Sequence, residues 1–446
     1  EDSPEMKYMH ARRQALGGFL PSRRRQAQPL AVPPLSTFDS LLQASGKDRE
    51  FSTTMAFVRA LGMLLKDKAI GKHIVPIVAD ESRTFGMEGL FRQIGIWSQQ
   101  GQLYTPQDKD QLMFYKEAKN GQILQEGINE AGAMCSWLAA ATSYSTHGVP
   151  MIPFFIFYSM FGVQRTGDLW WAAGDSRARG FLLGGTAGRT TLNGEGLQHE
   201  DGHSHVWAAQ IPNCVPYDPT FGYEVAVILQ DGLRRMYAEQ EDVYYYLTVM
   251  NENYTHPALP KGAEEGILKG MYRLRKAPAG KGARVQLLGS GTILNEVIAA
   301  ADLLKKDWKV AADIWSCPSF TLLARDGESC ARWNLLNPEG KRRVPYVEQC
   351  LKDTSGPVIA STDYVRAFAD QIRPYIRRQY RVLGTDGFGR SDTREKLRHF
   401  FEVDRHWVVL AALTALVEEK KLKRDVLAKA IKKYGLDPAK PNPMTV

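Results

Sequence analysis

The sequence predicts an α/β protein with two domains in series behind a linker. The chain has 446 residues, more than the roughly 250–300 residues at which one hydrophobic core stops growing. Short apolar runs alternate with helical patterns in two stretches, which is typical of parallel sheets covered on both faces. Residues 260–282, rich in glycine and lysine, separate the two stretches. We therefore expect a linker at 1–45, a first domain at 46–272 and a second at 273–446.

The linker prediction rests on composition. Residues 1–45 are basic and weakly periodic, and Pro29, Pro33 and Pro34 favour extended backbone. We expect this segment to wrap a neighbour. The chain begins at Glu1 without a leader pattern, so no targeting signal can be read, and we interpret the chain as a fragment of a longer protein or one part of a nicked or split one.

The first domain opens with a helix. Ser52 offers an N-cap, and the apolar residues from Met55 to Leu65 follow helical spacing. A strand at 73–79 follows and ends at Asp80 and Glu81. Further strands are expected at 151–158, 180–185 and 244–250, and helices at 128–142 and 223–237. Because these strands are apolar on both faces, a parallel sheet is predicted.

The second domain repeats the alternation. A strand at 285–288, the turn Gly289-Ser290-Gly291 and a helix at 292–304 open it. Strands at 311–316, 358–361 and 381–383 and a helix at 407–419 are expected to complete it. The glycine turn could bind phosphate, but it lacks the full dinucleotide fingerprint, so a tight strand-to-helix turn is favoured.

Composition excludes several classes of protein. No apolar run approaches the roughly 20 residues that a membrane-spanning helix needs, so no membrane contact is expected. The net charge of +8 is scattered, and no aromatic residues interleave with its basic clusters as in a nucleic-acid interface. The five cysteines form no CxxC pair. They are expected to be mostly buried free thiols in a reducing cytoplasm.

Four longer motifs point to a family. They occupy residues 79–90, 121–130, 192–205 and 385–392. The second contains Gly127-Ile128-Asn129-Glu130, which resembles the Gly-Ile-x-Glu element of transketolase-type thiamine-diphosphate enzymes. All four, in this order, are similar to the bacterial homodimeric pyruvate dehydrogenase family, and the resemblance spans essentially the whole chain. It implies a pyrimidine-binding parallel-sheet domain followed by a transketolase-type C-terminal α/β domain.

The resemblance assigns the central carboxylate to Glu130. In the family, a glutamate hydrogen-bonds the cofactor's pyrimidine nitrogen and favours the imino tautomer that activates the thiazolium carbon. Glu126 is expected one helical turn earlier on the same face. Chemistry alone therefore leaves both carboxylates open, and the motif match selects Glu130. The alternative for Glu130 is an exposed carboxylate at a helix start, stabilised by the helix dipole.

The resemblance also assigns a cofactor pocket. Ile128 matches the aliphatic residue that holds the cofactor bent, Phe161 the residue that stacks on the pyrimidine, and Tyr158 a residue that lines the site. Taken without the family, such residues are core by default.

A histidine loop follows. His199 matches the family's substrate-facing histidine, and Glu195 belongs to the same loop. His199, His203 and His205 also suggest a metal site, but their spacing fits no familiar zinc pattern. We expect no metal ligands here, and His203 and His205 are expected to hold the loop by hydrogen bonds.

Carboxylates at the first strand's end complete the candidates. The resemblance places Glu81 in the catalytic carboxylate network, and Asp80 and Asp108 near the cofactor. Crowded carboxylates raise one another's pKa, so one of them is expected to hold a proton at neutral pH.

The function implied is oxidative decarboxylation of pyruvate on thiamine diphosphate with Mg²⁺, followed by reductive acetylation of lipoyl domains on dihydrolipoyl acetyltransferase. A homodimer is implied as well. No Gly-Asp-Gly metal motif occurs in the chain, so we expect the metal and diphosphate site in a preceding domain and weak cofactor binding by this chain alone. The alternatives are a related 2-oxo acid decarboxylase or ketol-transferase, and a non-catalytic fragment or assembly subunit.

Overall fold

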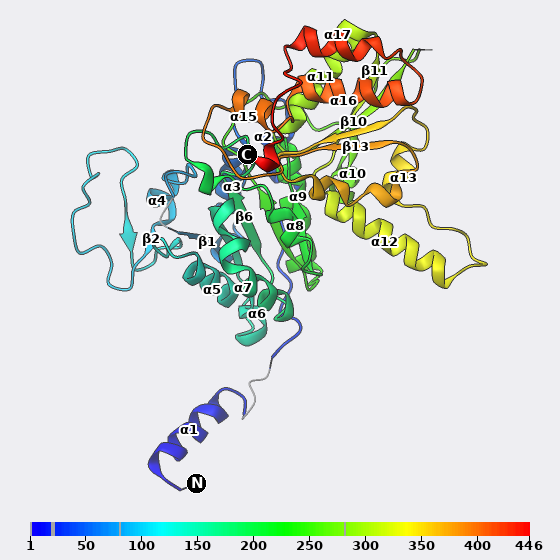
Figure 1. Ribbon diagram of the computed structural model, residues 1–446. Helices are drawn as coiled ribbons and strands as arrows, with labels where there is room; N and C mark the ends of the chain where they lie inside the picture. The colour runs from blue at the N-terminus through cyan, green and yellow to red at the C-terminus, as the bar shows by residue number, and fades with distance from the viewer. Residues whose placement is uncertain (1, 19–22, 80–81, 281) are drawn as a thin grey trace.

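The computed structural model describes residues 2–18, 23–79, 82–280 and 282–446. Helix α1 (Pro4–Ala15) is capped by the Ser3 side chain and lies away from the other elements in Figure 1. This helix was not predicted. Farther along the expected linker, the Arg24 N–H donates to the Ser145 carbonyl and the Leu30 N–H to the Tyr237 carbonyl, both at 3.0 Å. The segment that follows α1 therefore runs along the first sheet domain, and it contains η1 (Leu35–Phe38) and α2 (Asp39–Leu42).

The first sheet has six strands in the order β4-β1-β5-β6-β8-β7. Every pairing between these strands is parallel, as the apolar runs predicted. The strands are β1 (Ile74–Val78), β4 (Leu124–Gln125), β5 (Ile152–Tyr158), β6 (Phe181–Gly185), β7 (Cys214–Tyr217) and β8 (Tyr244–Thr248). The sequence had indicated β1, β5, β6 and β8, but not the edge strands β4 and β7.

Both faces of this sheet are buried. Phe154 and Ile156 of β5 face one apolar cluster, which includes residues of α3 (Thr53–Leu64) and α9 (Gly222–Leu233). Phe155 and Phe157 of the same strand face a second cluster. That second face is covered by α5 (Glu130–Ala141), α7 (Val163–Asp175) and α8 (Ser204–Ala208).

The second sheet has five strands in the order β13-β12-β10-β11-β9. These are β9 (Tyr272–Arg275), β10 (Arg284–Gly289), β11 (Ala311–Ser316), β12 (Val358–Ser361) and β13 (Tyr380–Leu383). Four strands pair in parallel, while β9 runs antiparallel to β11 at the edge. The sheet is therefore mixed, which the sequence pattern did not indicate.

Helices cover this sheet on both sides as well. One face packs against α11 (Ile293–Trp308) and α16 (Arg405–Glu418), and the other against α12 (Phe320–Leu336), α13 (Tyr346–Leu351) and α14 (Arg366–Asp370). Further elements are α4 (Gly89–Ile94), β2 (Ile96–Trp97), β3 (Glu117–Ala118), α6 (Ser143–Thr146), η5 (Arg234–Ala238), α10 (Glu264–Lys269), α15 (Arg394–Phe400) and α17 (Asp425–Tyr434). The turn Gly289-Ser290-Gly291 joins β10 to α11, and the buried Ser290 hydroxyl donates to Asp218 at 2.7 Å.

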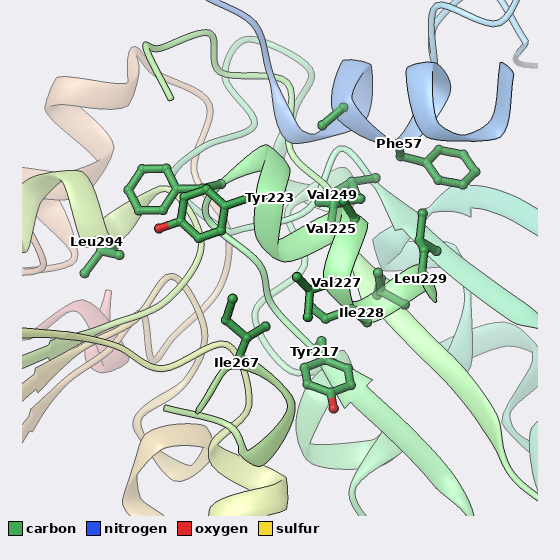
Figure 2. Packing of buried hydrophobic residues seen from close by; sticks show 14 of the residues in the cluster. Phe57, Tyr217, Tyr223, Val225, Val227, Ile228, Leu229, Val249, Ile267 and Leu294 are labelled. Atoms are coloured by element: carbon green, nitrogen blue, oxygen red, sulfur yellow. The ribbon is translucent and has the colours of Figure 1, made fainter. Parts of the chain in front are cut away.

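One apolar core joins the two sheets. Helix α9 lies at its centre, where Tyr223 and Ile228 pack among residues of α3, α10 and α11 (Figure 2). The same cluster holds Val78 from the first sheet and Leu287 from the second. The two α/β domains therefore share buried surface rather than meeting only through a linker.

The structure also bears on the expectations about membrane-spanning helices and cysteines. No helix of the described residues is long and apolar enough to cross a bilayer. All five cysteines are free thiols. Cys214, Cys317 and Cys330 are buried, while Cys135 on α5 is exposed. Burial raises the pKa of the Cys214 thiol to about 12, so this cysteine is inert, as expected.

Candidate active site

Candidate site residues gather where the strands of the first sheet end. Strand β4 ends at Gln125, and the Glu126 N–H donates to the Val78 carbonyl at 3.0 Å, at the end of β1. Strand β5 ends at Tyr158 and leads directly into the short helix η3 (Ser159–Phe161). The carboxyl ends of parallel strands are where α/β sheets place their ligands.

Glu130 is the first residue of α5. Gly127 turns the chain with φ of 69°, and the Asn129 side chain then caps α5 by accepting the Gly132 N–H at 3.0 Å. The helix therefore begins two residues later than predicted. Glu126 lies in the β4–α5 loop, outside the helix, so the expected one-turn relation between Glu126 and Glu130 was wrong.

The Glu130 carboxylate is buried, with only 9% of the residue exposed. Its Oε1 accepts from Arg165 Nη1 at 3.1 Å. The Arg165 guanidinium lies over the Phe161 ring, 3.9 Å from its centre. One arginine of α7 thus connects the candidate carboxylate with the candidate aromatic residue, and sequence reasoning missed it. Its spacing from Phe161, one helical turn, was the available signal.

Aromatic rings form a wall beside this carboxylate. The rings of Tyr158 and Phe161 lie 5.8 Å apart, edge to face. His199 packs edge-on against both, with ring centres at 5.3 Å from Tyr158 and 4.9 Å from Phe161. Phe85 packs on Tyr158 from behind, at 5.6 Å. The structure therefore brings Tyr158, Phe161 and His199 together, as the resemblance implied.

The His199 imidazole has an open nitrogen. Its Nδ1 is buried, and no described residue hydrogen-bonds to it. His199 is the last residue of η4 (Leu197–His199), and its backbone N–H donates to the Gly196 carbonyl at 3.2 Å. A buried imidazole nitrogen without a partner costs free energy unless a ligand satisfies it.

Asp201 fixes the backbone just after this loop. It is fully buried and accepts from the hydroxyls of Ser159 and Ser204. It also accepts the N–H groups of His203, at 2.9 Å, and Ser204, at 3.0 Å. These hydrogen bonds outweigh the effect of burial and hold the pKa of Asp201 below its usual range. Asp201 joins the histidine loop to the end of β5, a role that the sequence did not reveal.

The histidines that follow are structural. His205 is buried and meets the Thr248 hydroxyl at 2.9 Å through Nε2. Burial lowers the pKa of His205 to about 3, which keeps its ring neutral. His203 meets the Gln164 side chain at 3.2 Å. Among the described residues, no group of three or more His, Cys, Asp or Glu side chains lies close enough to hold a metal ion.

The other predicted residues lie at varied places. Ile128 is 77% exposed on the loop before Glu130, and Glu195 is exposed on the histidine loop. Asp108 pairs with Arg83 and accepts the Tyr115 N–H at 2.9 Å, within the long connection between β2 and β3. Asp80 and Glu81 fall outside the described residues.

This geometry suits a flat, partly apolar ring. A buried carboxylate can hydrogen-bond a ring nitrogen at one edge while Phe161 packs against its face. The open His199 nitrogen adds a second polar group beside the same aromatic wall. The Glu130 side of the site borders exposed residues, because Ile128 and Arg165 are exposed. This side of the candidate site is therefore open to a ligand or to a partner chain.

Family models match both halves of the chain. The model described as "Pyruvate dehydrogenase E1 component middle domain" matches residues 30–257, and the "Transketolase-like TK C-terminal domain" matches residues 270–404. Curated relatives named "Pyruvate dehydrogenase E1 component" are 72% identical in Cupriavidus necator and 60% identical in Escherichia coli K12. The matches cover 100% and 99% of this chain, respectively, but 50% of each relative. The chain thus spans half the length of these relatives.

Solved structures share the fold at low identity. A transketolase from Leishmania mexicana superposes with a TM-score of 0.64 at 17% identity, covering 87% of this chain and 48% of that chain. A structure titled "Split gene transketolase, inactive beta4 tetramer" superposes with a TM-score of 0.54 at 14% identity. It covers 83% of this chain and 99% of its own, so the same two-domain arrangement occurs there as a separate polypeptide.

Proposed function

The chain belongs to the pyruvate dehydrogenase E1 component family, and from this premise we propose that it supplies one wall of a thiamine-diphosphate site that decarboxylates pyruvate. The observation that carries the proposal is the buried Glu130 carboxylate beside the wall of Tyr158, Phe161 and His199. The pyrimidine end of the cofactor fits this wall, because the wall offers a buried acceptor, an aromatic face and an unpartnered imidazole nitrogen.

Glu130 is the proposed centre of the chemistry. When bound, thiamine diphosphate supplies a carbanion and an electron sink. Glu130 would hydrogen-bond the ring nitrogen of the pyrimidine and would thereby favour its imino tautomer. Arg165 hydrogen-bonds Oε1 of this carboxylate, and we assign Oε2 to the ring. Burial strengthens this hydrogen bond because little water competes for it.

The aromatic wall orients the ring and excludes water. Phe161 would pack on the ring face, and the Arg165 guanidinium, stacked on the Phe161 ring, would help to fix its orientation. Tyr158 closes the edge near His199. Ile128 is exposed on the described chain and is assigned to support of the bent cofactor. A large apolar side chain so exposed gains stability when a ligand or partner covers it.

His199 is assigned to the substrate side. Its unpartnered Nδ1 can donate or accept one hydrogen bond at the site, which suits a group that holds a proton near the reacting carbon. Glu195 of the same loop, Asp108 in the β2–β3 connection, and the sequence-predicted residues Asp80 and Glu81 are proposed to contribute further carboxylates.

The finer parts of the proposal concern acceptor, metal and partners. We assign the acyl acceptor to lipoyl domains of dihydrolipoyl acetyltransferase, in keeping with the E1 name of the relatives. The proposal includes Mg²⁺ at the cofactor's diphosphate, but it assigns no described residue of this chain as a metal ligand. A homodimer in the cytoplasm, with domains at 46–272 and 273–446, completes it.

A Glu130→Gln variant tests the function. The amide cannot hold the proton, so pyruvate-dependent reduction of an artificial electron acceptor is expected to fall about 100-fold or more, with the fold unchanged. The assay contains thiamine diphosphate, Mg²⁺ and the half of the Cupriavidus necator relative that this chain does not match.

The matched control is Glu264→Gln, which removes a first-turn carboxylate from α10. It is expected to leave turnover at the wild-type rate. A Glu130→Gln protein that turns over pyruvate as fast as the Glu264→Gln control refutes the assigned role.

A further inference from the structure

Residues of the second domain hydrogen-bond to the segment that leads into the His199 loop. We define this loop as residues 192–199. Just before it, the Thr190 N–H and hydroxyl donate to Asp363 Oδ1 at 2.8 and 2.6 Å, and the Thr191 hydroxyl donates to Oδ2 at 2.5 Å. Asp363 follows β12 of the second sheet and is completely buried. Arg394 of α15 adds a hydrogen bond from Nε to the Thr191 carbonyl at 2.7 Å.

Residues of the second domain also contact the end of this loop, through one hydrogen bond and one close backbone approach. Glu200, the residue after His199, accepts the Arg390 N–H through Oε2 at 2.7 Å. The chain passes so close at Gly389 that a methyl group there would lie 2.6 Å from the Leu197 carbonyl oxygen and 2.8 Å from Glu200 Oε2. Only a residue without a side chain fits between the two segments.

Arg189 of the first domain adds two hydrogen bonds to the second domain. The Arg189 guanidinium is buried and donates from Nη1 to the carbonyls of Thr385, at 2.5 Å, and Gly387, at 2.6 Å. Arg189 thus holds the segment at 385–390 against the first domain, next to Thr190 and Thr191, which donate to Asp363. The contacts at the two loop ends therefore belong to one connected interface.

The loop has little internal support. Its own backbone hydrogen bonds are long: the Leu192 N–H reaches the Gly188 carbonyl at 3.4 Å, and the His199 N–H reaches the Gly196 carbonyl at 3.2 Å. Gly194 and Gly196 both have positive φ, which gives the loop wide conformational freedom when unrestrained. Its position is therefore set by the contacts at its ends, together with the packing of the His199 ring against Tyr158 and Phe161.

We propose that the second domain positions His199, with Asp363 holding one end of the loop and Glu200, through the backbone of Gly389 and Arg390, holding the other. The inference rests on the proposed function, in which His199 faces the substrate. Glu200 and Asp363 act through the loop and are positioning residues. The second domain thereby takes part in the chemistry of a site built on the first sheet.

Gly389→Ala tests the proposal from the second domain. The new methyl group pushes Leu197 and Glu200 away, and the backbone itself is not strained, because φ at Gly389 lies in the ordinary range. Amide hydrogen exchange in the peptide covering 192–200 is expected to speed up severalfold. Turnover of pyruvate by the assembled protein is expected to fall about tenfold, mostly in kcat, because a small displacement of a reacting group lowers the rate steeply. Gly280→Ala, whose methyl group meets open space, is the control.

Amide hydrogen exchange and pyruvate turnover together distinguish a failure of this inference from a failure of the proposed function. If the wild type fails to turn over pyruvate, the proposed function is refuted. Amide hydrogen exchange in residues 192–200 still shows whether the second domain restrains the His199 loop. If exchange speeds up but kcat and KM stay at the Gly280→Ala values, the positioning role is refuted. If amide hydrogen exchange in residues 192–200 is unchanged in Gly389→Ala, the second domain does not restrain the loop through this contact.

A variant pair at Glu200 tests the other side of the contact. Glu200→Gln keeps an oxygen that can accept the Arg390 N–H, whereas Glu200→Ala removes it. We expect Glu200→Gln to restore most of the kcat lost in Glu200→Ala. Equal losses in the two variants contradict positioning through this hydrogen bond.

Discussion

Glu224 provides a direct test of how the two domains are joined. It lies on α9 and is completely buried. Its Oε2 accepts the N–H groups of Thr220, at 2.5 Å, and Phe221, at 3.1 Å. Its Oε1 accepts the hydroxyls of Tyr272, at 2.7 Å, and Ser316, at 2.6 Å, both from the second sheet. One carboxylate therefore satisfies donors from both domains, and burial raises its pKa.

Glu224→Ala orphans two kinds of donor. The hydroxyls can rotate to other partners, and Tyr272 already lies 2.6 Å from the Tyr223 hydroxyl. The two backbone N–H groups cannot, and each buried unpaired group costs about 1–3 kcal/mol. We expect the free energy of unfolding to fall by about 3–4 kcal/mol. Glu224→Gln keeps an acceptor for the N–H groups, and its amide can donate to the hydroxyls, so a loss of about 1 kcal/mol is expected.

Urea unfolding of the purified chain measures both variants. Tryptophan fluorescence and far-ultraviolet circular dichroism are recorded together, because coincident transitions indicate that both domains unfold as one unit. The expected order of stability is wild type, then Glu224→Gln, then Glu224→Ala. An Ala variant within 1 kcal/mol of the wild type, or a Gln variant as unstable as the Ala variant, refutes this account of the junction.

Two further predictions concern His199 and pH. His199→Ala is expected to lower kcat for pyruvate at least about tenfold while thiamine diphosphate binding changes less than twofold; equal losses in both, measured by steady-state kinetics and cofactor titration, contradict a substrate-side role. Burial raises the pKa of Glu200 from 4.5 to about 8. Between these values the unfolded chain has released a proton that the folded chain still holds, so the contribution of Glu200 to stability is lost as pH rises from about 5 to 9. His205, whose pKa burial lowers to about 3, has the opposite effect, and its contribution is lost as pH falls below about 6.5. Denaturation series at several pH values should show a shallower fall in Glu200→Gln above pH 6, and an unchanged slope would contradict the assignment.

The sequence predicted the central strands of both sheets because their apolar runs are buried on two faces. β5 illustrates this, since its alternate residues Phe154 and Phe155 face different clusters. The edge strand β13 was predicted, whereas the edge strands β4, β7 and β9 were missed, two of them for a clear physical reason. β4 has only two residues, and β9 carries Arg273 and Arg275 on an exposed edge, so neither has an apolar run.

The juxtaposition of candidate residues could be anticipated only for residues that match the family motifs. Tyr158, Phe161 and His199 do meet, as the resemblance implied. Asp201 and Glu200 act through contacts that depend on tertiary packing, and the only local signal for Arg165 was its helical spacing from Phe161. Asp363 lies more than 170 positions from Thr190 along the chain, a pairing that spacing cannot reveal.

The most direct test of the central claim is pyruvate-dependent acceptor reduction by the wild-type chain assembled with the unmatched half of its relative, with thiamine diphosphate and Mg²⁺ present. The account predicts turnover that neither polypeptide gives alone. An assembled, folded complex that leaves pyruvate untouched would contradict it and would indicate a chain that keeps the family's structure without its chemistry.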